Sequence, residues 1–144
     1  MSAVSLANVR SAISSNIDAV SGFTLLKLPP AYFGRSQNTI AHLGFTVGID
    51  STNESTERQR GISNQFYLIS SVTVKFLYRL RPLDLYPTDY DNCLDKEELV
   101  IKAVLGDYTG SIKIRPRYIS SQREISNSME YMITTINFQV QHSI

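Results

Sequence analysis

Apolar residues near the N-terminus recur at intervals of three and four positions, the spacing that places side chains along one face of an α-helix. They are Leu6, Val9, Ile13, Ile17 and Val20. Gly22 follows this run. It suits the left-handed residue that closes many helices, because glycine has no Cβ to clash there. The pattern therefore predicts a first helix that ends at Gly22.

Alternation of apolar and polar residues predicts three strands, at residues 43–49, 66–78 and 132–140. In the longest of them Ile69 and Leu77 interrupt the polar side, so we expect its second face to be partly covered by a helix or a neighbouring subunit. Two shorter strands are predicted at residues 24–28 and 112–118. Pro116 moves the latter towards a sheet edge or a bulge, because proline cannot donate to a ladder.

A second helix is predicted at residues 88–105. Thr88 and Asp91 have the spacing of a helix-start signal, and Gly106 is a suitable stop. The predicted apolar face of this helix is Tyr90, Cys93, Leu94, Ile101, Val104 and Leu105.

Two polar segments are predicted to be loops, at residues 50–61 and 120–128. The first has no apolar residue in twelve positions. Loops of that length in a small domain are more often functional than simple connectors.

These elements predict the order α-β-β-β-α-β-β and an α+β fold. We expect one mostly antiparallel mixed sheet of about 4–5 strands packed by two α-helices. A chain of 144 residues can bury one core, so a single domain over residues 1–144 is expected.

The composition excludes several classes of protein. A net charge of +1 provides no overall field to attract a polyanion. No apolar run approaches the roughly 20 residues that span a bilayer, and the N-terminus does not resemble a signal peptide, so we expect a protein that stays in the cytoplasm where it is made. The single cysteine, Cys93, excludes an internal disulfide and a cysteine-built metal site within one chain.

Charge is unevenly distributed along the chain. Residues 84–98 contain the six acids Asp84, Asp89, Asp91, Asp95, Glu97 and Glu98 and one base, Lys96. The bases on either side are Lys75, Arg79, Arg81, Lys113, Arg115, Arg117 and Arg123. Such runs are either solvated faces or complementary surfaces between neighbouring subunits.

Motifs of known chemistry are absent. The sequence has no glycine-rich phosphate loop, serine elbow or paired-histidine motif, and the aspartates of the acidic run lack the glycine and glutamate positions of a calcium loop. His42 and His142 are predicted to be surface or structural residues, and Cys93 to be inert core. Glu97 and Glu98 point in different directions on a helix, which makes a poor acid–base pair. No enzyme activity, metal or cofactor is therefore expected.

The strongest nucleic-acid signal is the alternating set Lys113, Arg115, Arg117 and Tyr118. Such a strand can follow a phosphate backbone. It has one interleaved aromatic residue, and the acidic helix would partly cancel its field. Specific nucleic-acid binding is therefore not expected, although a small nucleic-acid-binding module remains an alternative.

The whole layout resembles the tail terminator (tail completion) proteins of long-tailed bacteriophages. The features that carry this resemblance are the N-terminal helix, the early strand with its proline turn, the polar loop ending Arg58-Gln-Arg-Gly61, the long alternating strand, the Asp-rich entry to the second helix and the closing strand. The resemblance covers nearly the whole chain and rests on layout, length and texture. Neck or head-completion (connector) proteins of the same kind of phage share much of this description and are the nearest alternative. An enzyme with an unrecognised site is a further alternative.

The resemblance implies a ring, typically a homohexamer, on the head-proximal end of the tail in the virion, made in the host cytoplasm. The ring would end tail polymerisation and provide the head–tail joining surface. The implied partners are further copies of the chain, the tail-tube protein and a neck or head-completion protein, with no small-molecule substrate and no membrane. Loops 50–61 and 80–91 are expected to contact neighbours or the tube.

A closed ring joins two different patches of the same chain, so the acidic helix of one subunit is expected to meet the basic strand of the next. The residues expected at subunit or partner interfaces are Arg58, Arg60, Arg79, Arg81, Asp89, Asp91, Asp95, Glu97, Glu98, Lys113, Arg115 and Arg117.

Overall fold

The computed structural model describes residues 4–26, 42–54, 67–81, 85–108, 114–125 and 131–143. Within them the elements are α1 (Leu6–Asp18), β1 (Thr24–Leu25), β2 (Gly44–Glu54), β3 (Tyr67–Arg79), α2 (Tyr86–Leu105), β4 (Ile114–Ile125) and β5 (Tyr131–Ser143). The predicted α+β class and the predicted order of elements are confirmed.

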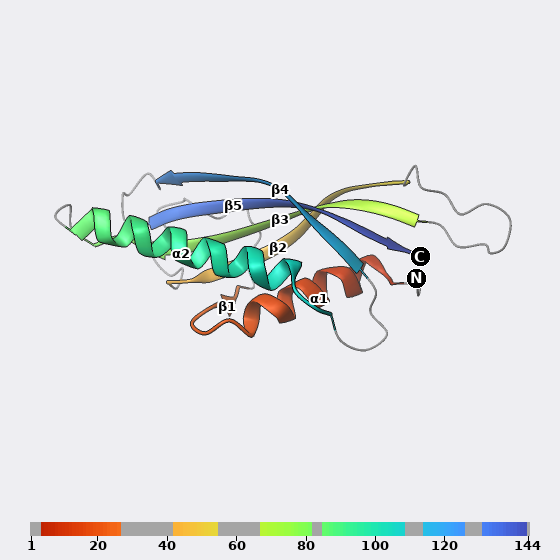
Figure 1. The fold of residues 1–144 in the computed structure, drawn as a ribbon, viewed down its shortest axis with the longest axis horizontal. Helices are drawn as coiled ribbons and strands as arrows, with labels where there is room; N and C mark the ends of the chain where they lie inside the picture. The colour runs from red at the N-terminus through yellow and green to blue at the C-terminus, as the bar shows by residue number, and fades with distance from the viewer. Residues whose placement is uncertain are drawn as a thin grey trace, which may run out of the picture.

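The five strands form one mixed sheet in the order β1-β2-β3-β5-β4. The short β1 runs parallel to β2, and the other three pairings are antiparallel. Pro116 lies in β4, at the edge of the sheet, as the sequence predicted. Figure 1 shows the long strands along the length of the molecule, with both chain ends at the same end.

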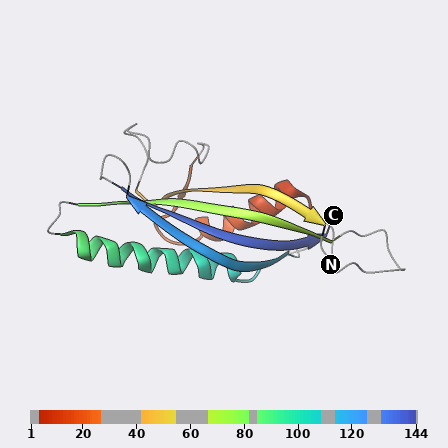
Figure 2. The ribbon, with the colours of Figure 1, turned by 90° about the horizontal axis from the view of Figure 1, so that it is seen from above.

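Both helices pack on the sheet through one apolar core. α1 lies against β1 and β2, α2 lies against β4 and β5, and the two helices touch each other (Figures 1 and 2). The sheet contributes fully buried side chains such as Phe45, Phe76 and Phe138, and the helices contribute Ile13 and Val100. Alternate residues of β3 and β5 reach this core because strand side chains alternate between the two faces.

The opposite face of the sheet is covered differently. Near one end, Leu77 and Ile133 form a small second cluster against Leu26 and Tyr131. Leu77 is one of the residues that interrupt the polar side of the predicted long strand, and it is 1% exposed. The rest of this face is mainly polar among the described residues, and it carries side chains that the site below uses.

The two predicted loops are partly wrong. β2 continues through residues 50–54, because these residues pair with β3 beyond a bulge after Ile49. β4 continues through residues 120–125, beyond a second bulge between Tyr118 and Ser120. The remainder of both predicted loops, residues 55–61 and 126–128, lies outside the described residues.

The predicted helix bounds also need correction. α2 begins at Tyr86, before Thr88, because Pro87 fits the first turn of a helix. The capping residue, Leu85, makes no side-chain hydrogen bond. Leu105, predicted on the apolar face, is 44% exposed. α1 ends at Asp18, and Gly22 beyond it has the positive φ, 94°, expected of a residue near a helix end. No helix in the described part of the chain is long and apolar enough to cross a membrane.

Candidate subunit and partner interfaces

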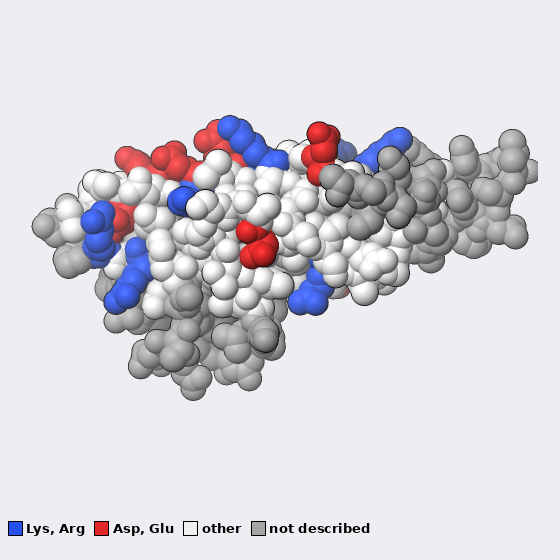
Figure 3. Space-filling view, turned by 90° about the horizontal axis from the view of Figure 1, so that it is seen from below, with Lys and Arg blue, Asp and Glu red and all other residues white. Residues whose placement is uncertain are grey.

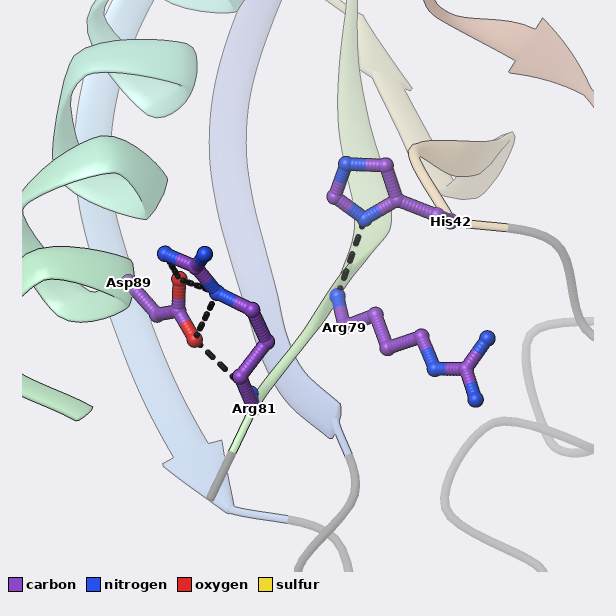
Figure 4. Close-up of polar contacts among 4 residues, drawn as sticks. All are labelled: His42, Arg79, Arg81 and Asp89. Carbon is purple, nitrogen blue, oxygen red and sulfur yellow. Dashed lines mark hydrogen bonds and ion pairs between the residues drawn. The ribbon is translucent and has the colours of Figure 1, made fainter. Parts of the chain in front are cut away.

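Asp89 in the first turn of α2 is bound to Arg81, just beyond the end of β3. The Arg81 backbone N–H donates to Asp89 Oδ2 at 2.7 Å, and Arg81 Nε donates to Oδ1 at 2.9 Å (Figure 4). The second guanidinium contact, from Nη2 to Oδ1, is 2.8 Å. Asp89 is 2% exposed, and hydrogen bonding from Arg81 holds the pKa of its carboxyl below the usual value. The pair joins the first turn of α2 to the chain just beyond the end of β3.

Glu97 in the middle of α2 is bound to Arg123 of the edge strand β4. Arg123 Nε donates to Glu97 Oε1 at 2.6 Å, and Arg123 Nη2 contacts Oε2 in a bidentate pair. Glu97 is 5% exposed, and its hydrogen bonds raise the pKa of Arg123. A forked pair of this kind combines charge with fixed geometry, so it sets the position of α2 over β4.

His42, at the entry to β2, has a structural role. The Arg79 backbone N–H donates to His42 Nδ1 at 3.0 Å, and the His42 and Tyr78 rings meet edge to face with centroids 4.6 Å apart. In Figure 4 the Arg79 guanidinium points away from Asp89, while that of Arg81 points towards it. The two neighbouring arginines therefore differ, and Arg79 presents its charge at the exposed end of β3.

The remaining acids of α2 lie on the surface. Asp91, Asp95 and Glu98 are exposed, and Glu98 Oε1 lies 4.0 Å from Lys102 Nζ, one turn further along the helix. Figure 3 shows acidic side chains gathered along the margin of the molecule where α2 runs, with some basic ones among them. Exposed charges of this kind add little to stability and remain open to a partner.

Arg115 and Arg117, two of the basic residues of β4, point away from α2. Tyr118 packs edge to face on the core residue Phe138, so Arg117 and Arg115 project from the other face of the sheet. Both arginines are exposed. The bulge after Tyr118 changes the alternation, and Arg123 consequently returns to the helix side and reaches Glu97.

A row of hydrogen-bonded polar side chains crosses this second face. Thr73 of β3 donates to Asp50 of β2 and approaches Asn137 of β5 at 3.3 Å, and Asn137 donates to Ser120 of β4 at 3.2 Å. Four strands are thus joined by side chains as well as by main-chain bonds. Cross-strand pairs of this kind stabilise the register of a sheet.

The buried polar groups do not form an accessible catalytic site. Ser70 Oγ and His142 Nε2 are hydrogen-bonded at 2.8 Å, and Thr52 Oγ1 lies 3.0 Å from Ser70 Oγ. Ser70 and His142 are fully buried, and burial lowers the pKa of His142, which favours the neutral ring. Cys93 is also buried, and burial raises the pKa of its thiol. Neither arrangement presents a nucleophile to a substrate.

No group of three or more His, Cys, Asp or Glu residues that could hold a metal ion occurs in the part of the chain that the structure describes.

The predicted interface residues fall into two groups in the structure. Arg81, Asp89 and Glu97 are engaged within the chain, although Arg81 is also exposed. The other described residues of the set are exposed: Arg79, Asp91, Asp95, Glu98, Arg115 and Arg117. Arg58, Arg60 and Lys113 lie outside the described residues. The pairing role of Arg123 was not predicted, because the residue lies in a polar segment that was expected to be a loop but belongs to β4.

Comparisons with known proteins give one informative result. No protein-family model matches the chain, and a search of curated proteins finds no match. Among solved structures, a chain of the "Virion of native gene transfer agent (GTA) particle" has a similar fold, with a TM-score of 0.60 at 8% sequence identity. The similarity covers 94% of this chain and 94% of that chain. At this identity it establishes a common fold.

Proposed function

We propose that the chain is a structural virion protein that forms a ring on the end of a phage tail tube, stops tail polymerisation and provides a surface for head–tail joining. One observation carries the proposal: the fold matches a chain of a virion particle over 94% of both chains. The resemblance of the layout to tail terminator proteins supports the more specific role. In this proposal the chain acts without catalysis, and its partners are its own copies, the tail-tube protein and a neck or head-completion protein.

The interface residues remain part of this proposal. Exposed charges on α2 and β4 are available to neighbours, whereas Asp89 and Glu97 act through the chain's own arginines. We assign Arg79, Arg115 and Arg117, with the exposed acids of α2, to subunit and partner contacts. Arg58, Arg60 and Lys113 are assigned with them on their sequence positions alone.

Deleting the gene from the phage that encodes it tests the role directly. A missing terminator leaves tube polymerisation unchecked, so electron microscopy of the lysate should show tails of irregular, extended length and unattached heads. Supplying the chain from a plasmid should restore tails of uniform length. Uniform tails that fail to join heads would overturn termination and favour the neck or head-completion alternative.

Assembly of the purified chain gives an independent test. Light scattering should yield a closed oligomer, either alone or after addition of tail-tube protein. A monomer at all concentrations, with and without the tube protein, would contradict the ring. Strong, salt-sensitive binding to DNA in a gel shift would instead favour the nucleic-acid module.

A further inference from the structure

The sheet has two different edges, and each has a stretch of strand with which another strand could pair. β4 is the outermost strand on one side over twelve residues, whereas on the other side β1 covers only the start of β2. Figure 2 shows β4 and β2 at opposite margins of the sheet. Exposed edges of this length present unpaired main-chain groups and favour pairing with another chain. Within the described residues no further strand pairs with either edge.

The main-chain pattern shows which part of the β2 edge is already occupied. Thr24 and Leu26 donate to the Leu43 and Phe45 carbonyls, and the next outward carbonyl, that of Val47, accepts from Arg10 Nε at 2.8 Å. Further along β2, the main-chain N–H and C=O groups of alternate residues point away from β3. Among the described residues, nothing pairs with the outward side of β2 from Ile49 to its end, so this segment is available to another chain.

Strand directions determine how copies can join. β2, β3, β5 and β4 alternate in direction, because each neighbouring pair is antiparallel. When one copy is rotated about a ring axis, its β2 therefore lies antiparallel to β4 of the preceding copy. Joining two different edges is a heterologous contact, the kind that generates closed rings.

Charge on the second face of the sheet is complementary at these two edges. Arg115 and Arg117 are exposed on β4, and Asp50 is exposed on β2. One row of the sheet runs from Ser51, beside Asp50, across β3 and β5 to Arg117. α2 is packed on the β4 side of the sheet, as the basic strand is. In a ring, α2 and β4 of one copy would therefore both lie towards the β2 side of the next copy. The α2 acids cannot then face the basic strand of a neighbour, and Asp50 of β2 is the favoured partner.

Apolar exposure is also concentrated on the β4 side. Tyr118, Ile119 and Ile125 of β4 are 40%, 45% and 42% exposed. Large apolar residues grouped along one edge strand are typical of a surface that another protein covers. Pro116 removes one donor from this edge, which leaves the flanking residues to pair.

We infer that β4 of one copy pairs antiparallel with the free part of β2 of the next copy, with Arg117 and Arg115 facing Asp50. The inference rests on the proposed ring and specifies its subunit contact. The partner of β4 is thus β2 of the next copy, and the partner of β2 is β4 of the preceding copy.

Charge reversal tests the contact. Arg117→Asp or Asp50→Arg alone should raise the concentration at half-assembly by about tenfold or more, since like charges then face each other. The two substitutions combined should restore assembly. Lys75→Glu is the matched control, because it reverses a charge on the same face but in the interior strand β3, and it should leave assembly unchanged. Sedimentation velocity measures the oligomer, and circular dichroism confirms folding.

Engineered cysteines give a second, geometric test. Ser51→Cys is combined in turn with Arg115→Cys, Arg117→Cys or Gln122→Cys, which covers shifts in register along β4. Within one copy, β2 and β4 are separated by two strands, or roughly 14 Å at ordinary spacing, too far for a disulfide. Oxidation should therefore yield a ladder of linked subunits for at least one pair, and no such ladder for variants with one engineered cysteine beside the buried Cys93.

The outcomes separate this inference from the proposed function. A ring that survives charge reversal and gives no cross-link from any pair overturns the edge contact and leaves the ring intact. Dimers from Arg117→Cys alone indicate that β4 pairs with β4, which also overturns it. A chain that remains monomeric with tail-tube protein present overturns the ring and the contact together.

Discussion

Burial divides the acidic residues of α2 into two groups. Asp89 and Glu97 are nearly buried, and each bonds an arginine of the same chain, whereas the others are exposed. Sequence position does not separate these groups. The partner of Glu97 lies 26 residues away on a strand that the residue pattern predicts only in part. Pairing across such a separation is set by packing of α2 on β4, which local patterns do not encode.

The Glu97–Arg123 pair should contribute measurably to stability. Glu97→Gln keeps the shape of the side chain but removes the charge that Arg123 binds, so we expect a loss of about 1–3 kcal/mol in the free energy of unfolding. Glu98→Gln, at the adjacent exposed position, should change it by about 0.5 kcal/mol or less. Urea unfolding of both variants provides the comparison. Equal losses in the free energy of unfolding would show that the buried Glu97–Arg123 pair contributes no more to stability than an exposed glutamate.

The Arg81–Asp89 pair predicts a pH dependence. Because Arg81 holds the folded-state pKa of Asp89 below its ordinary value of 3.8, the contribution of the pair is fully present above that value. It is lost as the pH falls through the lower folded-state pKa. Asp89→Asn should therefore lower the urea midpoint most at neutral pH, and its difference from the wild-type chain should shrink in acid. A difference that stays constant down to pH values below 3.8 would contradict this assignment.

At the scale of elements, the sequence patterns predicted the cores of the helices and strands well. α1 and the central strands β3 and β5 follow the periods of 3.6 and 2 because each buries one face. The patterns failed where strands are polar on both faces. Residues 50–54 and 120–125 pair with β3 and β5 through main-chain bonds and bulges, so tertiary pairing overrides a composition that is typical of loops.

Docking of α1 depends on a few buried residues. Ile13 is fully buried in the core beneath the sheet, so Ile13→Ala should cost about 2–5 kcal/mol by removing contacts and leaving a cavity. Leu6→Ala is the control on the same helix, since Leu6 is 42% exposed, and should cost about 1 kcal/mol or less. Thermal or urea unfolding measures both. Similar costs would indicate that α1 is held mainly by its ends.

At the scale of the whole molecule, the surface charges divide by face and by edge. Arg115 and Arg117 of β4 lie on the sheet face away from the helices, and Asp91, Asp95 and Glu98 are exposed along α2. The sequence revealed both charge groups but not this arrangement, because the bulge in β4 decides which of its residues face α2. If the sheet edges join neighbouring copies, the acids of α2 are left for a different protein.

Neutralising the exposed acids of α2 should therefore separate partner binding from ring formation. The combined substitution Asp91→Asn, Asp95→Asn and Glu98→Gln should leave the oligomer mass unchanged and weaken binding to the tail-tube or the neck protein, with a reduced dependence on salt. For a control of equal charge change, the pair Asp18→Asn and Asp107→Asn, which are exposed acids of other segments, is compared with the α2 pair Asp91→Asn and Asp95→Asn. Sedimentation velocity gives the mass, and titration calorimetry with each partner at two salt concentrations gives the affinity. Loss of the oligomer in the α2 variant would show that the α2 acids take part in ring contacts. Equal affinities in the α2 variant and the control would show that the position of the removed charges does not matter. Either result would contradict the assignment of the α2 acids to a partner protein.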